Sequence, residues 1–352
     1  MNTRFHLRER VFGDLRSVGH TSRRTGKEPA EEIEGEEPLV AAGIAAPSGP
    51  EPAAIDTFMF GEPEMMAAHL LAGPKAAIVD PGPANTVGNL KASLDAMGID
   101  SIDSIVLTHI HFDHAAGAAK LAQHFPEASV YIHERVAAHL VDPARLIKGV
   151  RSVWGEKTEQ LFGLPDPIEA ERVVAVGDGD SIDLGDRRLE AVATPGHTRA
   201  HISFLDSETG AVLCGDAIGL QMPSSRVIRP STPPSDFSFA DARESIERLA
   251  QIGASSVHLP HFGETGSPPD RVFDEADEAL RSWHETFLEN REASESDLEL
   301  QRRLNACVEA SLEPVTPVTR KGLEAVNPVW LNIAGMAAEA ERDERGSGRP
   351  TG

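Results

Sequence analysis

The sequence THIHFDH, residues 108–114, is the most informative segment of this chain. It places three histidines and one aspartate directly after the apolar stretch Ser104–Leu107, which we expect to be a buried strand. A loop that follows a strand can aim several side chains at one point, whereas side chains along a strand alternate between two faces. Imidazole and carboxylate groups without thiolates suit Zn²⁺, Fe²⁺ or Mn²⁺. The motif therefore predicts a metal site.

Three further candidate ligands also stand just after expected strands. His197 follows a strand at 189–193, Asp216 follows a strand at 211–213, and His261 follows a strand at 256–259. Expected helices alternate with strands in the first half of the chain, which indicates a layered α/β protein with helices covering sheet. Four strand ends that deliver histidine and aspartate to one edge predict a shared metal site.

This arrangement resembles the metallo-β-lactamase superfamily over about residues 55–263. The resemblance rests on the HxHxDH block, the TPGHTRAHI stretch at 194–202, the aspartate after Gly215, the LPHFG stretch at 259–263, and Asp80 in the turn VDPG at 79–82. It implies a four-layered αβ/βα sandwich with the site at one edge between two sheets. Within the superfamily, 194–202 and the final HFG are most similar to the glyoxylase-like, hydroxyacylglutathione-hydrolase-like enzymes.

The resemblance also implies a role for each residue of the site. One metal ion would be held by His109, His111 and His197, a second by Asp113, His114 and His261, and Asp216 would bridge the two. Zinc is the expected ion, with iron and manganese as alternatives. Histidine rather than glutamate at position 111 favours hydrolysis over the reduction of oxygen or nitric oxide.

The expected reaction uses two divalent ions to lower the pKa of a bridging water, which gives a hydroxide nucleophile at neutral pH. Asp113 is the expected catalytic residue, because it can orient the nucleophile and pass a proton toward the leaving group. Asp80 and His201 are candidates to hold the second ring nitrogen of metal-binding histidines, and a purely structural role is the alternative for each. His258 is not expected to be a ligand.

The expected function is metal-dependent hydrolysis of a small ester, thioester or lactone. One alternative is a mononuclear-iron enzyme of sulfur or redox chemistry, which would require that His114 or His261 hold no second metal ion. A phosphodiesterase or nuclease, and a metal-binding protein without catalysis, are the others. Tyr131, the single tyrosine, lies on a strand rather than beside the site, which disfavours a lactonase.

The 352 residues divide into four expected parts. Residues 1–54 are expected to be a disordered tail, 55–268 the catalytic domain, 269–340 a C-terminal helical extension, and 341–352 a polar tail. We expect helices at 269–292, 297–312 and 322–340, and one long helical segment at 143–162. The extension can pack on the sandwich and wall one side of the active-site cleft, or it can form a homodimer.

Charge and composition narrow the partners. The formal net charge of −23 disfavours nucleic acid as a partner, and a small molecule is the expected substrate.

No apolar run approaches the roughly 20 residues needed to cross a bilayer, and residues 1–10 lack the apolar core of a secretory signal, so a cytoplasmic location is expected. Two cysteines cannot build a disulfide framework. In the loop 217–236, Arg226 or Arg229 could meet an anionic substrate or could be a surface residue.

Overall fold

The computed structural model describes residues 38–41, 44–223, 227–291, 299–300, 302–303, 306 and 317–346. The expectations for residues 1–37, for Arg226, for most of the helix at 297–312 and for residues 347–352 lie outside these ranges. In the described parts of the chain, no helix is both long and apolar enough to span a bilayer.

The first sheet contains the strands that lead to the HxHxDH block. Its order is β1(Ala53–Asp56), β2(Ala67–Leu71), β3(Ala77–Val79), β4(Ser104–Val106), β5(Ser129–His133) and β6(Val173–Val176). The strands β3 to β6 are parallel, whereas β1 and β2 are antiparallel neighbours. The carboxyl ends of β3 and β4 therefore meet at the same edge of this sheet.

The second sheet has the order β12(Gly263–Glu264), β11(Ser256–Leu259), β10(Ala211–Leu213), β9(Ile202–Asp206), β8(Arg188–Ala193) and β7(Ser181–Asp183). The pair β10 and β11 is parallel, and β9 runs antiparallel to both β8 and β10. The strands β8, β10 and β11 therefore point the same way, so that the segments after them begin at one edge.

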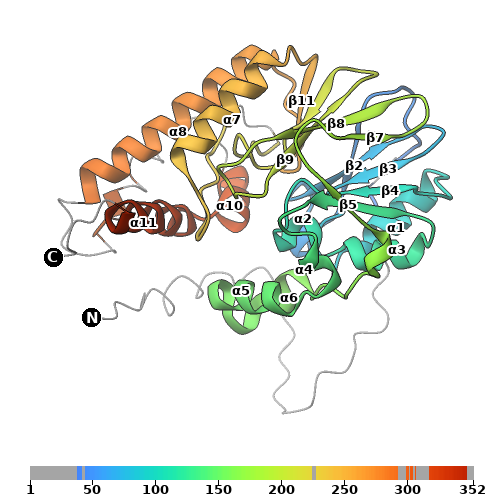
Figure 1. The fold of residues 1–352 in the computed structure, drawn as a ribbon, viewed down its shortest axis with the longest axis horizontal. Helices are drawn as coiled ribbons and strands as arrows, with labels where there is room; N and C mark the ends of the chain where they lie inside the picture. The colour runs from blue at the N-terminus through green and yellow to red at the C-terminus, as the bar shows by residue number, and fades with distance from the viewer. Residues whose placement is uncertain are drawn as a thin grey trace. The chain divides into compact units, whose positions relative to one another are not determined.

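Three apolar clusters show that the molecule has four layers (Figure 1). Val79, Val106, Leu189 and Phe204 belong to the cluster between the two sheets. A second cluster packs the helices α1(Val87–Ala96) and α3(Ala118–His124) against the outer face of the first sheet. The third packs α7(Phe239–Gln251) and α8(Pro269–Arg291) against the second sheet. The expected αβ/βα sandwich is confirmed.

The long helical segment expected at 143–162 is present, and the structure divides it into shorter helices. It contains α5(Ala144–Trp154), a 3-10 turn η4(Gly155–Lys157) and α6(Thr158–Phe162), after the short helix α4(Ala138–Val141). Gly155 has φ +65°, a left-handed conformation that ends α5. The predicted helical segment is confirmed, but the apolar periodicity continues across Gly155 and did not indicate this division.

The C-terminal extension also has one more break than predicted. In place of a helix at 322–340, the structure has α10(Pro317–Val326) and α11(Val329–Gly346). Pro328 lies between them, where it has no N–H to donate and disfavours helical backbone at Asn327. The extension packs on the second sheet, since Leu323 and Met336 share a cluster with Val257 of β11.

Contacts with the sandwich begin before residue 55, where the sequence placed the end of the tail. The strand β1 starts at Ala53, and the carbonyl oxygen of Pro50 accepts a hydrogen bond from Arg187. The guanidinium of Arg187 is buried and also pairs with Asp206 at 3.0 Å. The hydrogen bond to Pro50 therefore ties the segment before β1 to the second sheet, where Arg187 precedes β8 and Asp206 ends β9.

Two histidines are buried in the core between the sheets. His69 of β2 and His258 of β11 are each 2% exposed, and their rings meet edge to face at 5.7 Å. Burial, reinforced by His258, lowers the pKa of His69 to about 3, and burial lowers the pKa of His258 to about 4 although Asp206 opposes it. Both side chains are therefore neutral in the folded protein at mildly acidic pH.

This pair predicts acid-sensitive stability. Because both folded-state pKa values lie below the ordinary value of about 6.5, the unfolded chain binds protons first as the pH falls. The contribution of the two histidines to the free energy of unfolding is fully present above pH ~7. Between pH 7.5 and pH 5, preferential protonation of the unfolded chain lowers the free energy of unfolding by about 2 kcal/mol for each histidine. Urea unfolding measures the free energy of unfolding at pH 7.5 and at pH 5. We expect the decrease between these two values to be about 2 kcal/mol smaller in His258→Leu than in the wild type. An equal loss in both proteins would contradict this explanation.

Candidate metal centre

Five strand ends converge at one edge of the sandwich. From the first sheet, Asp80 follows β3, and the loop after β4 carries the HxHxDH block into the short helix α2(Phe112–Ala115). From the second sheet, the segments after β8, β10 and β11 carry His197, Asp216 and His261. The structure thus brings together in space the seven residues that were expected to hold metal: His109, His111, Asp113, His114, His197, Asp216 and His261.

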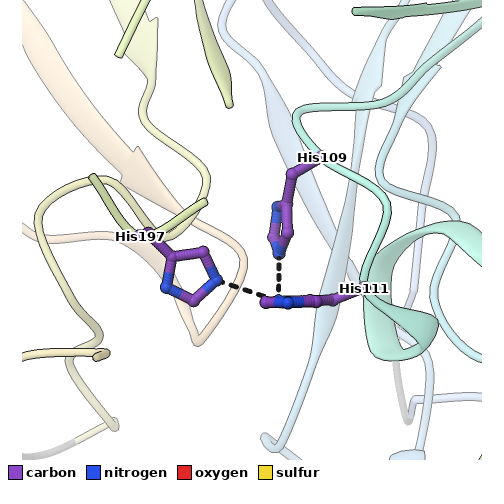
Figure 2. Close-up of side chains that lie close together, drawn as sticks. All are labelled: His109, His111 and His197. Carbon is purple, nitrogen blue, oxygen red and sulfur yellow. Dashed lines mark hydrogen bonds between the residues drawn. The ribbon is translucent and has the colours of Figure 1, made fainter. Parts of the chain in front are cut away.

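The first cluster is a set of three imidazoles whose ring nitrogens face one another (Figure 2). His111 Nδ1 lies 3.0 Å from His109 Nε2 and 2.9 Å from His197 Nε2. His109 Nδ1 contacts the Thr108 hydroxyl at 3.0 Å, and His197 Nδ1 donates to the carbonyl oxygen of Ser231 at 3.0 Å. Because a carbonyl oxygen can only accept, the Nε2 atom of His197 carries a lone pair, which is the form that a metal ion requires.

The second cluster combines a carboxylate with two imidazoles. Asp113 Oδ2 lies 3.6 Å from both His114 Nε2 and His261 Nε2. His261 Nδ1 donates to the carbonyl oxygen of Met65 at 2.6 Å, so its Nε2 also carries a lone pair. The Nε2 atoms of His114 and His261 are buried with no hydrogen-bond partner among the described residues. Buried polar atoms without partners are rare, and this donor set fits a divalent cation.

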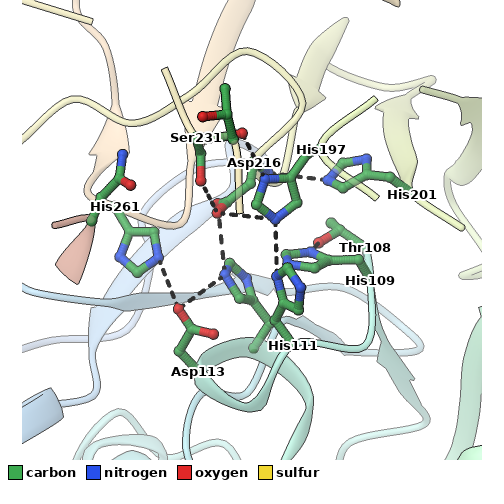
Figure 3. A network of polar contacts seen from close by, with 12 residues as sticks. Thr108, His109, His111, Asp113, His197, His201, Asp216, Ser231 and His261 are labelled. Carbon is green, nitrogen blue, oxygen red and sulfur yellow. Dashed lines mark hydrogen bonds and ion pairs between the residues drawn. The ribbon is translucent and has the colours of Figure 1, made fainter. Parts of the chain in front are cut away.

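Asp216 lies between the two clusters (Figure 3). Its Oδ2 is 3.6 Å from His197 Nε2 of the first cluster, and its Oδ1 is 3.6 Å from His114 Nε2 of the second. Oδ1 is buried and has no hydrogen-bond partner within the described ranges. One carboxylate thus presents one oxygen to each set of imidazoles, which is the geometry of a bridging ligand.

The charges in the centre favour a cation. Burial lowers the pKa of His114, but the carboxylates of Asp113, Asp216 and Asp80 outweigh it and raise that pKa to about 10. Burial, reinforced by the neighbouring histidines, holds the pKa of His109 and of His197 well below the ordinary value, so both are neutral. A divalent ion that binds here competes with the proton on His114 and releases it.

Asp80 fixes the orientation of two predicted ligands. Its Oδ1 accepts from Thr108 N at 2.8 Å, and its Oδ2 accepts from Thr108 Oγ1 at 2.7 Å and from His114 Nδ1 at 3.1 Å. Because Thr108 Oγ1 donates its single hydrogen to Asp80, it can only accept a hydrogen bond from His109 Nδ1. One buried carboxylate thereby fixes the hydrogen on Nδ1 of His109 and of His114, so that Nε2 is the atom of His114 that would lose its proton to a metal ion. Asp80 has φ +52°, a conformation that aspartate tolerates better than most residues.

His201 acts on the backbone rather than on another imidazole. Its Nδ1 contacts Thr194 Oγ1 at 2.8 Å, and its Nε2 accepts the backbone N–H of Asp216 at 3.1 Å. We expected His201 to bind the second ring nitrogen of a metal-binding histidine. Instead, it accepts a hydrogen bond from the main chain of Asp216. A Cβ on Gly215, at φ +53°, would lie 2.5 Å from His201 Nε2, so only glycine fits before Asp216.

Sequence reasoning missed the carbonyl partners of the centre. The oxygens of Ser231 and Met65 orient His197 and His261, and no sequence signal marks them because every residue offers a carbonyl. Neither interpretation of Arg229 was correct, since its guanidinium is 1% exposed, lies over the Trp283 ring and pairs with Glu324 at 2.6 Å. His258 lies in the core and not among these clusters, as expected.

Comparison with known proteins agrees with this geometry. The Metallo-beta-lactamase superfamily pattern matches residues 68–261, more than half of the chain. A metallo-beta-lactamase fold-containing protein of Sulfurisphaera tokodaii is 27% identical over 57% of this chain and 74% of its own length. A hydroxyacylglutathione hydrolase of Aeromonas hydrophila is 32% identical over 40% of this chain, but the match spans only 41% of that enzyme.

Solved structures show the same fold. An archaeal metallo-beta-lactamase superfamily protein from Sulfolobus tokodaii aligns with a TM-score of 0.58 at 22% identity, covering 78% of this chain and 93% of that one. A metallo-beta-lactamase family protein from Thermus thermophilus aligns with a TM-score of 0.53 at 23% identity, covering 80% and 89%. Fold and site together define a hydrolase-like α/β protein with candidate metal-binding groups. The chain belongs to the metallo-β-lactamase superfamily.

Proposed function

We propose that this chain is a hydrolase that holds two zinc ions and cleaves a small ester, thioester or lactone. The observation that carries the proposal is the position of Asp216, whose two carboxylate oxygens each lie 3.6 Å from an imidazole of a different cluster. The unpartnered Nε2 atoms of His114 and His261 support a second ion beside the first. When bound, two divalent ions supply a hydroxide nucleophile at neutral pH and polarise a carbonyl oxygen.

Asp113 is the residue best placed to handle the proton. Its side chain is 23% exposed, whereas those of His114 and Asp216 are 0% and 6% exposed, so solvent reaches Asp113 more readily than these two groups. Burial raises the pKa of Asp113, but His114 and His261 outweigh it and hold that pKa below the ordinary value. It is therefore a carboxylate at neutral pH, able to accept a hydrogen bond from the nucleophile and pass a proton toward the leaving group.

No protein nucleophile is needed in this scheme. Cys214 follows β10 close to Asp216, but it is buried, and burial raises the pKa of its thiol far above neutral. Arg229 pairs with Glu324 of the C-terminal helices, so this arginine is not available to meet a substrate. Similarity to part of a hydroxyacylglutathione hydrolase supports a thioester as the first substrate class to screen.

The metal content of the protein tests this proposal. Protein purified without added metal should contain two zinc ions per chain by plasma mass spectrometry, and it should hydrolyse members of an ester and thioester panel. A chelator-treated sample, with and without zinc returned, is the matched control for activity. A single iron per chain would favour the mononuclear sulfur or redox alternative. No metal, even after reconstitution, would contradict the proposal.

A further inference from the structure

The segment Arg229–Thr232 lies between the metal centre and the C-terminal helices. On the side of the centre, Ser231 makes two contacts: its carbonyl oxygen accepts from His197 Nδ1 at 3.0 Å, and its hydroxyl donates to Asp216 Oδ2 at 3.4 Å (Figure 3). Ser231 therefore sets the ring orientation of one predicted ligand and touches the predicted bridging carboxylate. Whatever holds this segment in place also holds these two side chains.

Two asparagines of the C-terminal extension form hydrogen bonds with the residues on either side of Ser231. Asn327 Nδ2 donates to the carbonyl oxygen of Pro230 at 2.7 Å. Asn332 Oδ1 accepts from the backbone N–H of Thr232 at 2.6 Å and lies 3.0 Å from the Thr232 hydroxyl. The peptide groups before and after Ser231 are thus both fixed from the same side.

The two asparagines also support each other. Asn332 Nδ2 donates to Asn327 Oδ1 at 2.5 Å and to the carbonyl oxygen of Pro328 at 3.2 Å. Asn327 is 3% exposed and Asn332 is 0% exposed, and each amide oxygen and nitrogen of the pair has a partner. A buried polar network in which every group is satisfied is rigid, and it is costly to disturb. The break at Pro328 is what brings the end of α10 and the start of α11 to the same segment.

The backbone packing allows little movement of this segment. Gly335 of α11 has no room for a Cβ, because such an atom would overlap the carbonyl group of Thr232 and meet the carbonyl carbon of Pro233 at 2.7 Å. On its other side, Arg229 exchanges two backbone hydrogen bonds of 2.9 Å with Leu220. The segment is therefore held between α11 and the stretch that follows β10.

We propose that Asn327 and Asn332 form a clamp that positions His197 for the first metal ion, acting through Pro230, Ser231 and Thr232. The clamp rests on the proposed function, since it presumes that His197 is a metal ligand. Asn327 and Asn332 are positioning residues that touch neither metal nor substrate. Outer groups that orient a ligand typically change metal affinity by about 10- to 100-fold when removed. Part of the C-terminal extension therefore belongs to the metal centre although it supplies no ligand.

The test compares two neighbouring buried residues of α11. Asn332→Ala removes the clamp, whereas Ile333→Ala removes apolar packing from the same helix and makes no bond to the 229–232 segment. Zn²⁺ affinity is measured by competition with a chelator, and Tm is measured without metal. We expect Asn332→Ala to weaken the first Zn²⁺ about 10- to 100-fold and Ile333→Ala to lower Tm with Zn²⁺ affinity within about twofold of the wild type. Asn327→Ala removes the hydrogen bond to the carbonyl oxygen of Pro230 and keeps those of Asn332 to Thr232. It replaces Asn332→Ala in this test if that variant does not fold.

The outcomes separate the clamp from the proposed function. Unchanged Zn²⁺ affinity in Asn332→Ala or Asn327→Ala, with two ions bound by the wild type, would overturn the clamp and leave the hydrolase intact. Equal losses of affinity in the asparagine variants and Ile333→Ala would overturn it as well, because affinity would then follow stability. A wild type that binds no Zn²⁺ would overturn both. The absorption spectrum of Co²⁺-loaded protein gives a second readout, since a displaced His197 changes the coordination that the spectrum reports.

Discussion

Asp216→Ala is expected to lower kcat/KM by about a thousandfold or more, equivalent to about 4 kcal/mol of transition-state stabilisation. The side chain presents one oxygen to His197 and one to His114, so that its removal deprives both clusters of an anionic ligand. Metal content should fall from two ions per chain to one or fewer. His111→Ala should have a similar effect, because His111 Nδ1 contacts both other imidazoles of its cluster.

An exposed aspartate provides the matched control. Asp183 of β7 forms a surface ion pair with Lys75, and its side chain is 66% exposed. Asp183→Ala should keep both metal ions and full activity, and circular dichroism should show the same fold for all three variants. If Asp216→Ala retained two metal ions and wild-type turnover, the assignment of Asp216 as the bridge would be wrong.

Asp80→Asn is expected to reduce metal affinity by about 10- to 100-fold or more, although it changes a single oxygen to an NH₂ group. The carboxylate accepts three hydrogen bonds, from Thr108 N, Thr108 Oγ1 and His114 Nδ1. An amide nitrogen in place of Oδ2 must donate, which forces His114 Nδ1 to accept and moves its hydrogen to Nε2. The Thr108 hydroxyl would then donate to His109 Nδ1, so both predicted ligands would take the wrong tautomer.

Chelator competition with Zn²⁺ measures this effect, and Asp103→Asn is its control. Asp103 Oδ2 accepts from the backbone N–H of Ala76, away from the clusters, so the same chemical change there should leave Zn²⁺ affinity within about twofold of the wild type. Asp80→Ala is a useful companion, because it removes the carboxylate without reversing any hydrogen bond. Wild-type Zn²⁺ affinity in Asp80→Asn would show that Asp80 does not set the tautomers.

A layered α/β fold and a shared metal site were predictable because their signals are local, whereas the four-layered sandwich and the division of the ligands into two clusters followed from the family resemblance. Each predicted ligand stands directly after a short apolar strand, and strands that run the same way end at the same edge whatever their register. Asp80 was singled out by the family resemblance of the VDPG turn at 79–82, and the structure places it directly after β3. A local motif and a strand end are enough to place a side chain at the rim of a sheet, so the residues of the centre required no knowledge of distant contacts.

The parts that were missed depend on contacts between distant segments. The ion pair of Arg229 with Glu324 joins residues 95 positions apart, and the bond from Asn327 to Pro230 joins residues 97 positions apart. The sequence of the loop 217–236 has no pattern that indicates its contacts with the C-terminal helices. The breaks at Gly155 and Pro328 were marked in the sequence, but the apolar periodicity on both sides outweighed them.

The division of the ligands between the two sheets has a consequence for the whole domain. Each cluster combines residues that follow β4 with at least one residue from the other sheet, so each ion would cross-link the halves of the sandwich. Because only the folded chain brings these ligands together, bound ions would stabilise the folded state relative to the unfolded chain, which has no such site. The edge proposed to carry the chemistry would then also hold the two sheets together, and we expect removal of metal to lower the stability of the sandwich together with its activity.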